Sequence, residues 1–156
     1  MITGIYGGSF NPFTSGHADI VSRALGVVDE LHIVVGKNIL KPNAAEEIES
    51  RVAAIRALYR DEPRVRVLSR DGILALYAQS LARSLEGRVV FVRGLRNASD
   101  LEAETPMAYV NRAKYGVETL FLLADPSLSF VSSSIVRELE SFGEDAGEFL
   151  PHPLEP

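Results

Sequence analysis

The sequence lacks cysteine altogether, which excludes disulfide bonds, thiolate metal sites and cysteine nucleophiles. It also lacks an apolar run long enough to cross a membrane, and no basic start is followed by a long apolar segment, so we expect a cytoplasmic protein with no membrane partner. An excess of positive charge is missing too. The net charge of -5 at pH 7 argues against a general nucleic-acid-binding protein, because such proteins are usually basic.

What is present is typical of a globular enzyme-sized domain. Hydrophobic residues make up 46% of the chain and charged residues 24%, which is ordinary for a folded protein. A length of 156 residues predicts a single domain over 1–156 with a core of its own. Prolines in the last stretch predict that residues 150–156 form an extended tail.

Short apolar runs alternate with segments of helical periodicity. The runs predict strands over residues 2–6, 31–35, 65–69, 89–92 and 119–123. Helices are predicted from about 17 to 25, through Ile48, Val52, Ile55 and Tyr59, through Leu74, Tyr77, Leu81 and Leu85, over about 98–114, and from the serines at 132–134. Asn43 and Glu46 have the spacing of a capping box, and Pro106 is expected to end or bend its helix near the first turns.

This alternation predicts the α/β class, a Rossmann-like doubly wound parallel sheet with helices on both faces. Ligands of such sheets bind beyond the carboxyl ends of the strands, where the strand order reverses. The loops that follow Tyr6, Val35, Val92 and Leu123 are therefore the candidate ligand loops.

The loop after the first strand carries GGSFNPFTSGH, residues 7–17. Its glycine pair lets the backbone approach an anion, and the helix that follows points free N–H groups at the same place. Neither G-x-G-x-x-G nor G-x-x-x-x-G-K-[ST] is present, so the loop is a phosphate loop of another kind. His17 shares the inward face with Ile20 and Val21, and a helix N-terminus favours a neutral imidazole that donates an N–H.

Two further segments supply phosphate-binding chemistry. Arg93 and Arg96 follow a predicted buried strand, and each guanidinium presents a planar fork of donors that suits phosphate. The serines at 132–134 open a helix, where they either cap N–H groups or donate to a bound phosphate.

GGSFNPFTSGH resembles the [T/H]-x-G-H signature of the nucleotidyltransferase superfamily. Within it, RGLR at 93–96, followed by Asp100, Glu104 and the pair Asn111 and Arg112, resembles the phosphopantetheine adenylyltransferases, as does SFVSSSIVRE at 129–138. The three motifs stand in the family's order, and the resemblance covers residues 1 to about 150. It implies transfer of the adenylyl group of ATP to 4′-phosphopantetheine, giving dephospho-coenzyme A and pyrophosphate in coenzyme A biosynthesis.

The resemblance also implies roles for individual residues. His17 would stabilise the transition state, with Lys41 and Arg96 offsetting its negative charge; Lys37 replaces Lys41 if the alignment shifts. Contacts to ATP are implied for Ser9, Phe10, His17, Gly94, Leu95, Arg96, Glu104, Leu128, Ser129, Phe130, Val131, Ser132, Ser133 and Ser134. Contacts to phosphopantetheine are implied for Ser9, Lys41, Leu74 and Arg93, although a place in the helix core explains Leu74 equally well.

The resemblance further implies Mg²⁺ between the ATP phosphates and a homohexamer. Since no cluster of metal ligands is visible in the sequence, we expect substrate and water to hold the Mg²⁺. Because the attacking phosphate is already an anion, neither a general base nor a covalent intermediate is required, and the protein supplies alignment and charge stabilisation.

Several positions leave other functions open. Ser9 and Asn11 stand where threonine and aspartate are frequent in the family, and Ala103 and Leu128 stand where aromatic residues are frequent, which affects adenine packing. GGSFNP is close to the loop of nicotinate-mononucleotide adenylyltransferases, but that family usually has histidine in place of Thr14 and lacks RGLR. The alternatives are therefore an adenylyltransferase of that type and a nucleotide-binding sensor without turnover.

Overall fold

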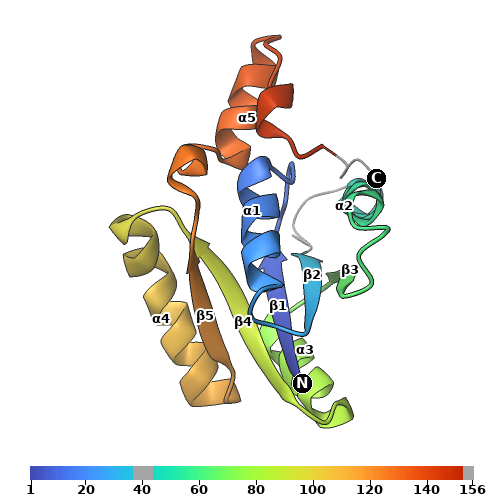
Figure 1. Ribbon diagram of the computed structural model, residues 1–156, viewed down its shortest axis with the longest axis vertical. Coiled ribbons are helices and arrows are strands. Elements are labelled where there is room, and N and C mark those ends of the chain that lie inside the picture. Colours follow the sequence, from blue (N-terminus) through green and yellow to red (C-terminus); the bar gives the residue numbers. More distant parts are fainter. Residues whose placement is uncertain (37–43, 153–156) are drawn as a thin grey trace.

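The protein is described by a computed structural model of residues 1–36 and 44–152 (Figure 1). Its parallel sheet has the strand order β3-β2-β1-β4-β5. The strands are β1 (Ile2–Gly8), β2 (Glu30–Gly36), β3 (Val65–Arg70), β4 (Arg88–Leu95) and β5 (Glu118–Leu123). The helices are α1 (Ser15–Ala24), α2 (Ala44–Leu58), α3 (Leu74–Ser84), α4 (Ala98–Tyr115) and α5 (Ser133–Ser141), with short 3₁₀ turns at Pro126–Leu128 and Gly147–Phe149.

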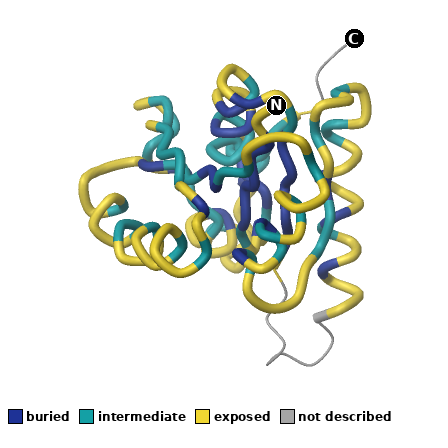
Figure 2. The backbone as a smooth tube through the Cα atoms, turned by 90° about the horizontal axis from the view of Figure 1, so that it is seen from below, coloured by how far each residue is buried: buried dark blue, intermediate teal, exposed yellow. Residues whose placement is uncertain are grey.

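Helices cover both faces of the sheet, which confirms the predicted doubly wound α/β fold. One core cluster joins α1 and α2 to the sheet through residues such as Ile20, Val21 and Ile55. The other joins α3 to the opposite face through Ala75 and Ala78. Figure 2 shows the buried residues concentrated in the central strands, with the outer sides of the helices exposed.

The mostly apolar composition of β1 and β2 explains why these strands lie in the interior of the sheet. β1 and β2 each bury five consecutive residues, most of them apolar, because helices cover both faces of these strands. β5 forms an edge of the sheet and has no fully buried residue. The reversal of strand order falls between β1 and β4, so their carboxyl ends form the predicted ligand edge.

Asn43 of the predicted capping box lies outside the described residues, as does the tail beyond residue 152. Pro106 is expected to end or bend α4; the helix does not end there, because it continues to Tyr115, and the bend stays a prediction. Pro106 lies on the exposed side of α4, so its ring is accommodated at the surface of the helix. Asn97 caps the start of the helix, and Gly116, with φ 69° in the left-handed conformation, ends it.

Replacing Pro106 by alanine is expected to stabilise the protein. The alanine restores the N–H that the helix interior lacks and removes the clash of the ring with the preceding turn. We expect the free energy of unfolding to rise by about 1–3 kcal/mol, measured by urea denaturation. Ala103→Gly on the same helix serves as a control and should lower it by about 1 kcal/mol. A loss of stability in Pro106→Ala would contradict this account of α4.

Candidate active site

A cavity of about 340 Å³ lies beyond the carboxyl ends of β1 and β4. Its walls come from β1 and the loop after it, from α1, β4 and α4, and from the segment before α5. Figure 1 shows how these elements meet, with α5 beyond the strand ends and the start of α1 beside it. We call this space the polar cavity, because His17, Arg93, Arg96, Asp100 and Glu104 line it.

His17 is held by the first turn of its own helix. Thr14 caps α1: its side chain accepts from the backbone N–H of His17, and its own N–H donates to His17 Nδ1 at 2.9 Å. A nitrogen that accepts from a backbone N–H cannot carry a proton, so the neutral ring is protonated at Nε2. The capping box therefore makes Nε2 a hydrogen-bond donor.

The imidazole is also kept neutral. Burial, together with the positive charges of Arg93 and Arg96, lowers the pKa of His17 to about 4, and burial makes the largest contribution. The aromatic rings of Phe10 and Phe13 lie at centroid distances of 5.0 and 5.3 Å. The predicted neutral donor is thus supported by geometry, although burial rather than the helix terminus is the main cause.

Both arginines of RGLR are paired with carboxylates of α4. Arg93 donates to Glu104 at 2.8 and 2.6 Å and to the carbonyl of Gly7 at 2.7 Å. Arg96 donates from its side chain to Asp100 at 2.9 and 3.1 Å. Burial opposes the charge of Arg93, but its hydrogen bonds to Glu104 and the charge of that carboxylate raise its pKa overall. Both guanidiniums therefore stay charged and retain free N–H groups for a ligand.

A second cavity of about 400 Å³ adjoins the first. The two share Gly7, Arg93 and Glu104. We call the second space the apolar cavity, since its walls are mostly hydrophobic: Ile5, Ile73, Leu74, Ala75, Phe91, Met107 and Ala108. Thr119 also lines it, and its Oγ1 is a buried hydroxyl without a hydrogen-bond partner among the described residues.

Most of the predicted ATP contacts come together. Those that line the polar cavity, among other residues, are Ser9, Phe10, His17, Gly94, Arg96, Glu104, Leu128, Val131, Ser132 and Ser133. They come from four separate parts of the chain, and the parallel register of β1 and β4 brings them to one edge. The predicted phosphopantetheine contacts Arg93 and Leu74 line the apolar cavity, and Arg93 lines both spaces.

Other predicted contacts lie elsewhere. Leu95 is buried in the sheet, and Ser129 Oγ donates to the carbonyl of Pro126 at 2.9 Å. Phe130 is 57% exposed and packs edge-to-face on Phe149.

Ser134 Oγ accepts from Arg137 on the exposed side of α5. Lys41 and its substitute Lys37 lie outside the described residues. The roles of these residues in binding stay predictions.

The glycines at the strand ends have a packing role that the sequence did not indicate. A β-carbon at Gly7 would collide with the side chain of Leu74, and one at Gly94 would come within 2.7 Å of Ile20. At Gly8 it would meet the ring of Phe10 at 3.1 Å. These contacts let α1 and α3 approach the ends of β1 and β4 closely.

Sequence reasoning also missed a bridge between α1 and the loop after β5. Asp19 accepts from the side chain of Arg23 and from the backbone N–H of Asp125, both at 2.9 Å. The spacing of four residues between Asp19 and Arg23 was a visible signal of a helix pair, but the contact with Asp125 spans 106 residues. This bridge holds the segment that carries Leu128 against α1.

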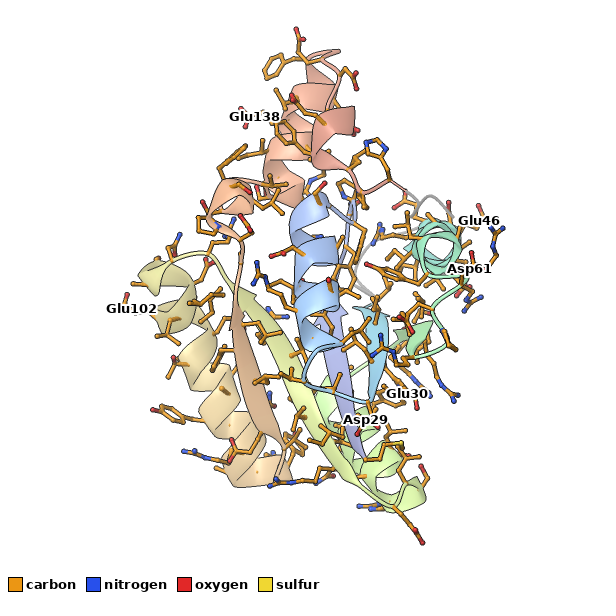
Figure 3. The ribbon with its side chains drawn as sticks, in the orientation of Figure 1. Asp29, Glu30, Glu46, Asp61, Glu102 and Glu138 are labelled. Atoms are coloured by element: carbon orange, nitrogen blue, oxygen red, sulfur yellow. The ribbon has the colours of Figure 1, made fainter. Side chains whose placement is uncertain are left out.

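Three carboxylates outside the cavity lie on exposed helix surfaces. Figure 3 labels Glu46, Glu102 and Glu138 on the outer sides of their helices, and all three are exposed. Across residues 1–36 and 44–152, no three acidic or histidine side chains gather as a metal site would require. Asp100 and Glu104 face the cavity, but each is paired with an arginine. In the same ranges, no helix has the length and apolar character needed to span a membrane.

Comparison with known proteins gives consistent matches over nearly the whole chain. The cytidylyltransferase-like family model matches residues 5–139. Phosphopantetheine adenylyltransferase of Bacteroides thetaiotaomicron is 41% identical over 99% of both chains. The enzyme of the same name from Porphyromonas gingivalis is 43% identical over 94% of this chain and 92% of its own. That of Corynebacterium diphtheriae is 38% identical over 92% and 87%.

The low pKa of His17 predicts a specific pH dependence of stability. In the unfolded chain His17 binds a proton near pH 6.5, whereas in the folded protein it does so only near pH 4. The unfolded state therefore takes up more protons between these values, and His17 destabilises the fold as the pH falls from 6.5 to 4. We expect the free energy of unfolding to fall by about 1.4 kcal/mol for each pH unit in this window because of His17, and we expect no contribution from it above about pH 7.5.

Urea denaturation of the wild type and of His17→Gln across pH 4–8 gives the free energy of unfolding of each protein as a function of pH. The difference between these two curves measures the contribution of His17. Glutamine cannot titrate, so the variant removes the contribution of the imidazole while keeping a polar side chain. Parallel curves for the two proteins would show that His17 titrates normally in the fold.

Proposed function

The chain belongs to the phosphopantetheine adenylyltransferases of the cytidylyltransferase-like family, and on that premise we propose that it transfers the adenylyl group of ATP to 4′-phosphopantetheine. The products are dephospho-coenzyme A and pyrophosphate. The observation that carries the proposal is the polar cavity, where a neutral Nε2 donor and two paired guanidiniums face one space.

The reaction needs no acid or base from the protein. An oxygen of the acceptor phosphate attacks the α-phosphorus of ATP, and the bond from that phosphorus to the oxygen of the pyrophosphate breaks. Charge builds up on the oxygens of the α-phosphate in the transition state, so donors held in place beforehand accelerate the step. A buried, neutral His17 with its proton on Nε2 is such a donor.

The two arginines divide between the substrates. We assign Arg96 and the polar cavity to the phosphates of ATP, and Arg93 to the phosphate of the acceptor. Arg93 lies where both cavities meet, so its free N–H groups reach the junction at which two phosphates must come together. Glu104 and the Gly7 carbonyl fix its plane, and a fixed plane lets a guanidinium bind phosphate with defined geometry.

The apolar cavity suits the uncharged arm of the acceptor. Leu74 and Met107 offer hydrophobic contact, while the side-chain amide of Asn111 can pair with an amide group of the arm. Nicotinate mononucleotide has a compact charged ring instead of a long arm, and this difference favours phosphopantetheine as the acceptor.

The phosphates of ATP and water molecules would hold the Mg²⁺ that the reaction uses. The carboxylates in the polar cavity are already bound by arginines, so the described residues do not form a protein cage for the ion. Mg²⁺ readily keeps water ligands and binds through substrate phosphates. We therefore propose that ATP carries Mg²⁺ into the cavity, and that both act in the cytoplasm, where ATP is made available.

We further propose a homohexamer. α4 has no buried residue, and its apolar Leu101, Met107, Tyr109 and Val110 are 43–60% exposed. Leu123 of the neighbouring edge strand is 73% exposed. Apolar groups gathered in this way are typical of surfaces that bind other protein chains.

The function is tested by pyrophosphate release with ATP and one acceptor at a time. We expect turnover with 4′-phosphopantetheine and none with nicotinate mononucleotide. His17→Ala is expected to lower kcat by about 10²–10³-fold, as the loss of one preorganised donor does. His152→Ala, which removes an exposed imidazole, is the matched control and should retain full activity. Release with nicotinate mononucleotide alone, or with neither acceptor, would overturn the proposal.

The division between the arginines is tested with Arg93→Lys. Lysine keeps the charge but cannot bond to Glu104 in two places and reach the Gly7 carbonyl as well. We expect calorimetry to show affinity for phosphopantetheine falling about tenfold, the loss of one charged hydrogen bond, and affinity for ATP changing less than about threefold. Arg88→Lys, at the other end of β4, should change neither. Equal losses for both ligands would reject the assignment.

A further inference from the structure

The loop between β1 and α1 contains a strained residue. Phe10 has a φ of 46°, in the left-handed region that residues with a β-carbon rarely adopt. Such a conformation costs on the order of 1 kcal/mol and persists only where the surroundings enforce it. The ring of Phe10 is 2% exposed and packs edge-on against His17, with centroids 5.0 Å apart.

Charged side chains from two distant helices hold the backbone on either side of Phe10. Arg51 of α2 donates from Nη1 to the carbonyl of Ser9 at 2.8 Å. Arg137 of α5 donates from Nη1 to the carbonyl of Asn11 at 2.5 Å. These two contacts bracket the strained residue, and Figure 1 shows α2 and α5 on different sides of the start of α1.

Neither guanidinium lines the polar cavity, so neither reaches a ligand there directly. Each acts on the backbone of the loop, and the loop acts on the cavity through Ser9, Phe10 and His17. A hydrogen bond from a charged donor is stronger than a neutral one, which suits the task of holding a strained turn.

A second hydrogen bond connects α5 to the same loop. Ser133 Oγ donates to the carbonyl of Pro12 at 2.8 Å, beside the contact of Arg137 with Asn11. Ser132 and Ser133 themselves line the polar cavity. The start of α5 and the first loop are therefore set relative to each other by direct bonds.

We propose that Arg51 and Arg137 are positioning residues that hold Phe10 in its left-handed conformation and thereby fix His17 for catalysis. The proposal deepens the proposed function and rests on it for its kinetic readout. Loss of either guanidinium lets the loop relax toward ordinary φ values, which moves the ring of Phe10 and the imidazole that it contacts.

The chain offers a matched control for Arg51. Arg56 lies on the same helix and also donates to a backbone carbonyl, that of Val67 on β3, at 2.7 Å. Arg56→Ala therefore removes the same kind of bond without touching the loop. Arg51→Ala, Arg137→Ala, their combination and Arg56→Ala are compared in kcat, in calorimetric ATP affinity and in melting temperature.

We expect Arg51→Ala and Arg137→Ala each to lower kcat by about 10–100-fold, since a shift of about 1 Å in a catalytic group has effects of that size. ATP affinity should fall about fivefold. Arg56→Ala should lower the melting temperature while kcat and ATP affinity change less than about twofold. Because both residues hold one turn, the loss of kcat in the double variant should be smaller than the product of the single losses.

Arg51→Lys and Arg137→Lys provide the test if an alanine variant fails to fold. Each keeps a charged donor and should recover part of the lost kcat. Normal kcat and ATP affinity in folded Arg51 and Arg137 variants would overturn the proposal, as would losses matched by Arg56→Ala or multiplying fully in the double variant. If the wild type turns over no acceptor, the proposed function fails, while ATP affinity across the same variants still decides the positioning role.

Discussion

The ion pair between Arg93 and Glu104 holds the site together. It links the end of β4 to α4, and a third hydrogen bond from Arg93 to the Gly7 carbonyl links both to β1. A partly buried ion pair is a poor source of stability, because desolvation offsets most of the attraction. Its value lies in geometry: it fixes one guanidinium at the place where the strand order reverses and the two cavities meet.

Pairing the arginines also changes the character of the polar cavity. The sequence indicates two arginines that suit phosphate, and the structure pairs Arg93 with Glu104 and Arg96 with Asp100, which neutralises their charge. What remains is a set of oriented donors, including the neutral imidazole of His17. Oriented donors stabilise charge that appears during a reaction without binding the resting anion too strongly, which suits catalysis better than net charge does. This explains how an acidic protein can handle two phosphorylated substrates.

The sequence predicts those parts of the fold and site that depend on local pattern. Apolar runs and helical spacing identify the strands β1 to β5 and the helices α1 to α5 of the described ranges, and parallel connection then brings the loop at residue 9 and the arginines at 93 and 96 to one edge. Long-range pairings could not be read in this way. Arg137 meets the Asn11 carbonyl across 126 residues, and Arg93 meets that of Gly7 across 86. Nothing in the local sequence around an arginine indicates which distant carbonyl it will bind, because such a contact is set by tertiary packing.

The glycines at the strand ends connect packing with chemistry. Gly7 and Gly94 lack side chains because Leu74 and Ile20 occupy the space that a β-carbon needs. Leu74 thereby comes close enough to line the apolar cavity, and Ile20 brings α1 close enough for His17 to face the polar cavity. The glycines interpreted from the sequence as phosphate-binding thus also allow the helices to pack closely against the ends of the strands. The same packing holds the helix that carries His17 at a fixed distance from the strand that carries Arg93. The backbone at these glycines is then also free to approach an anion between the two residues.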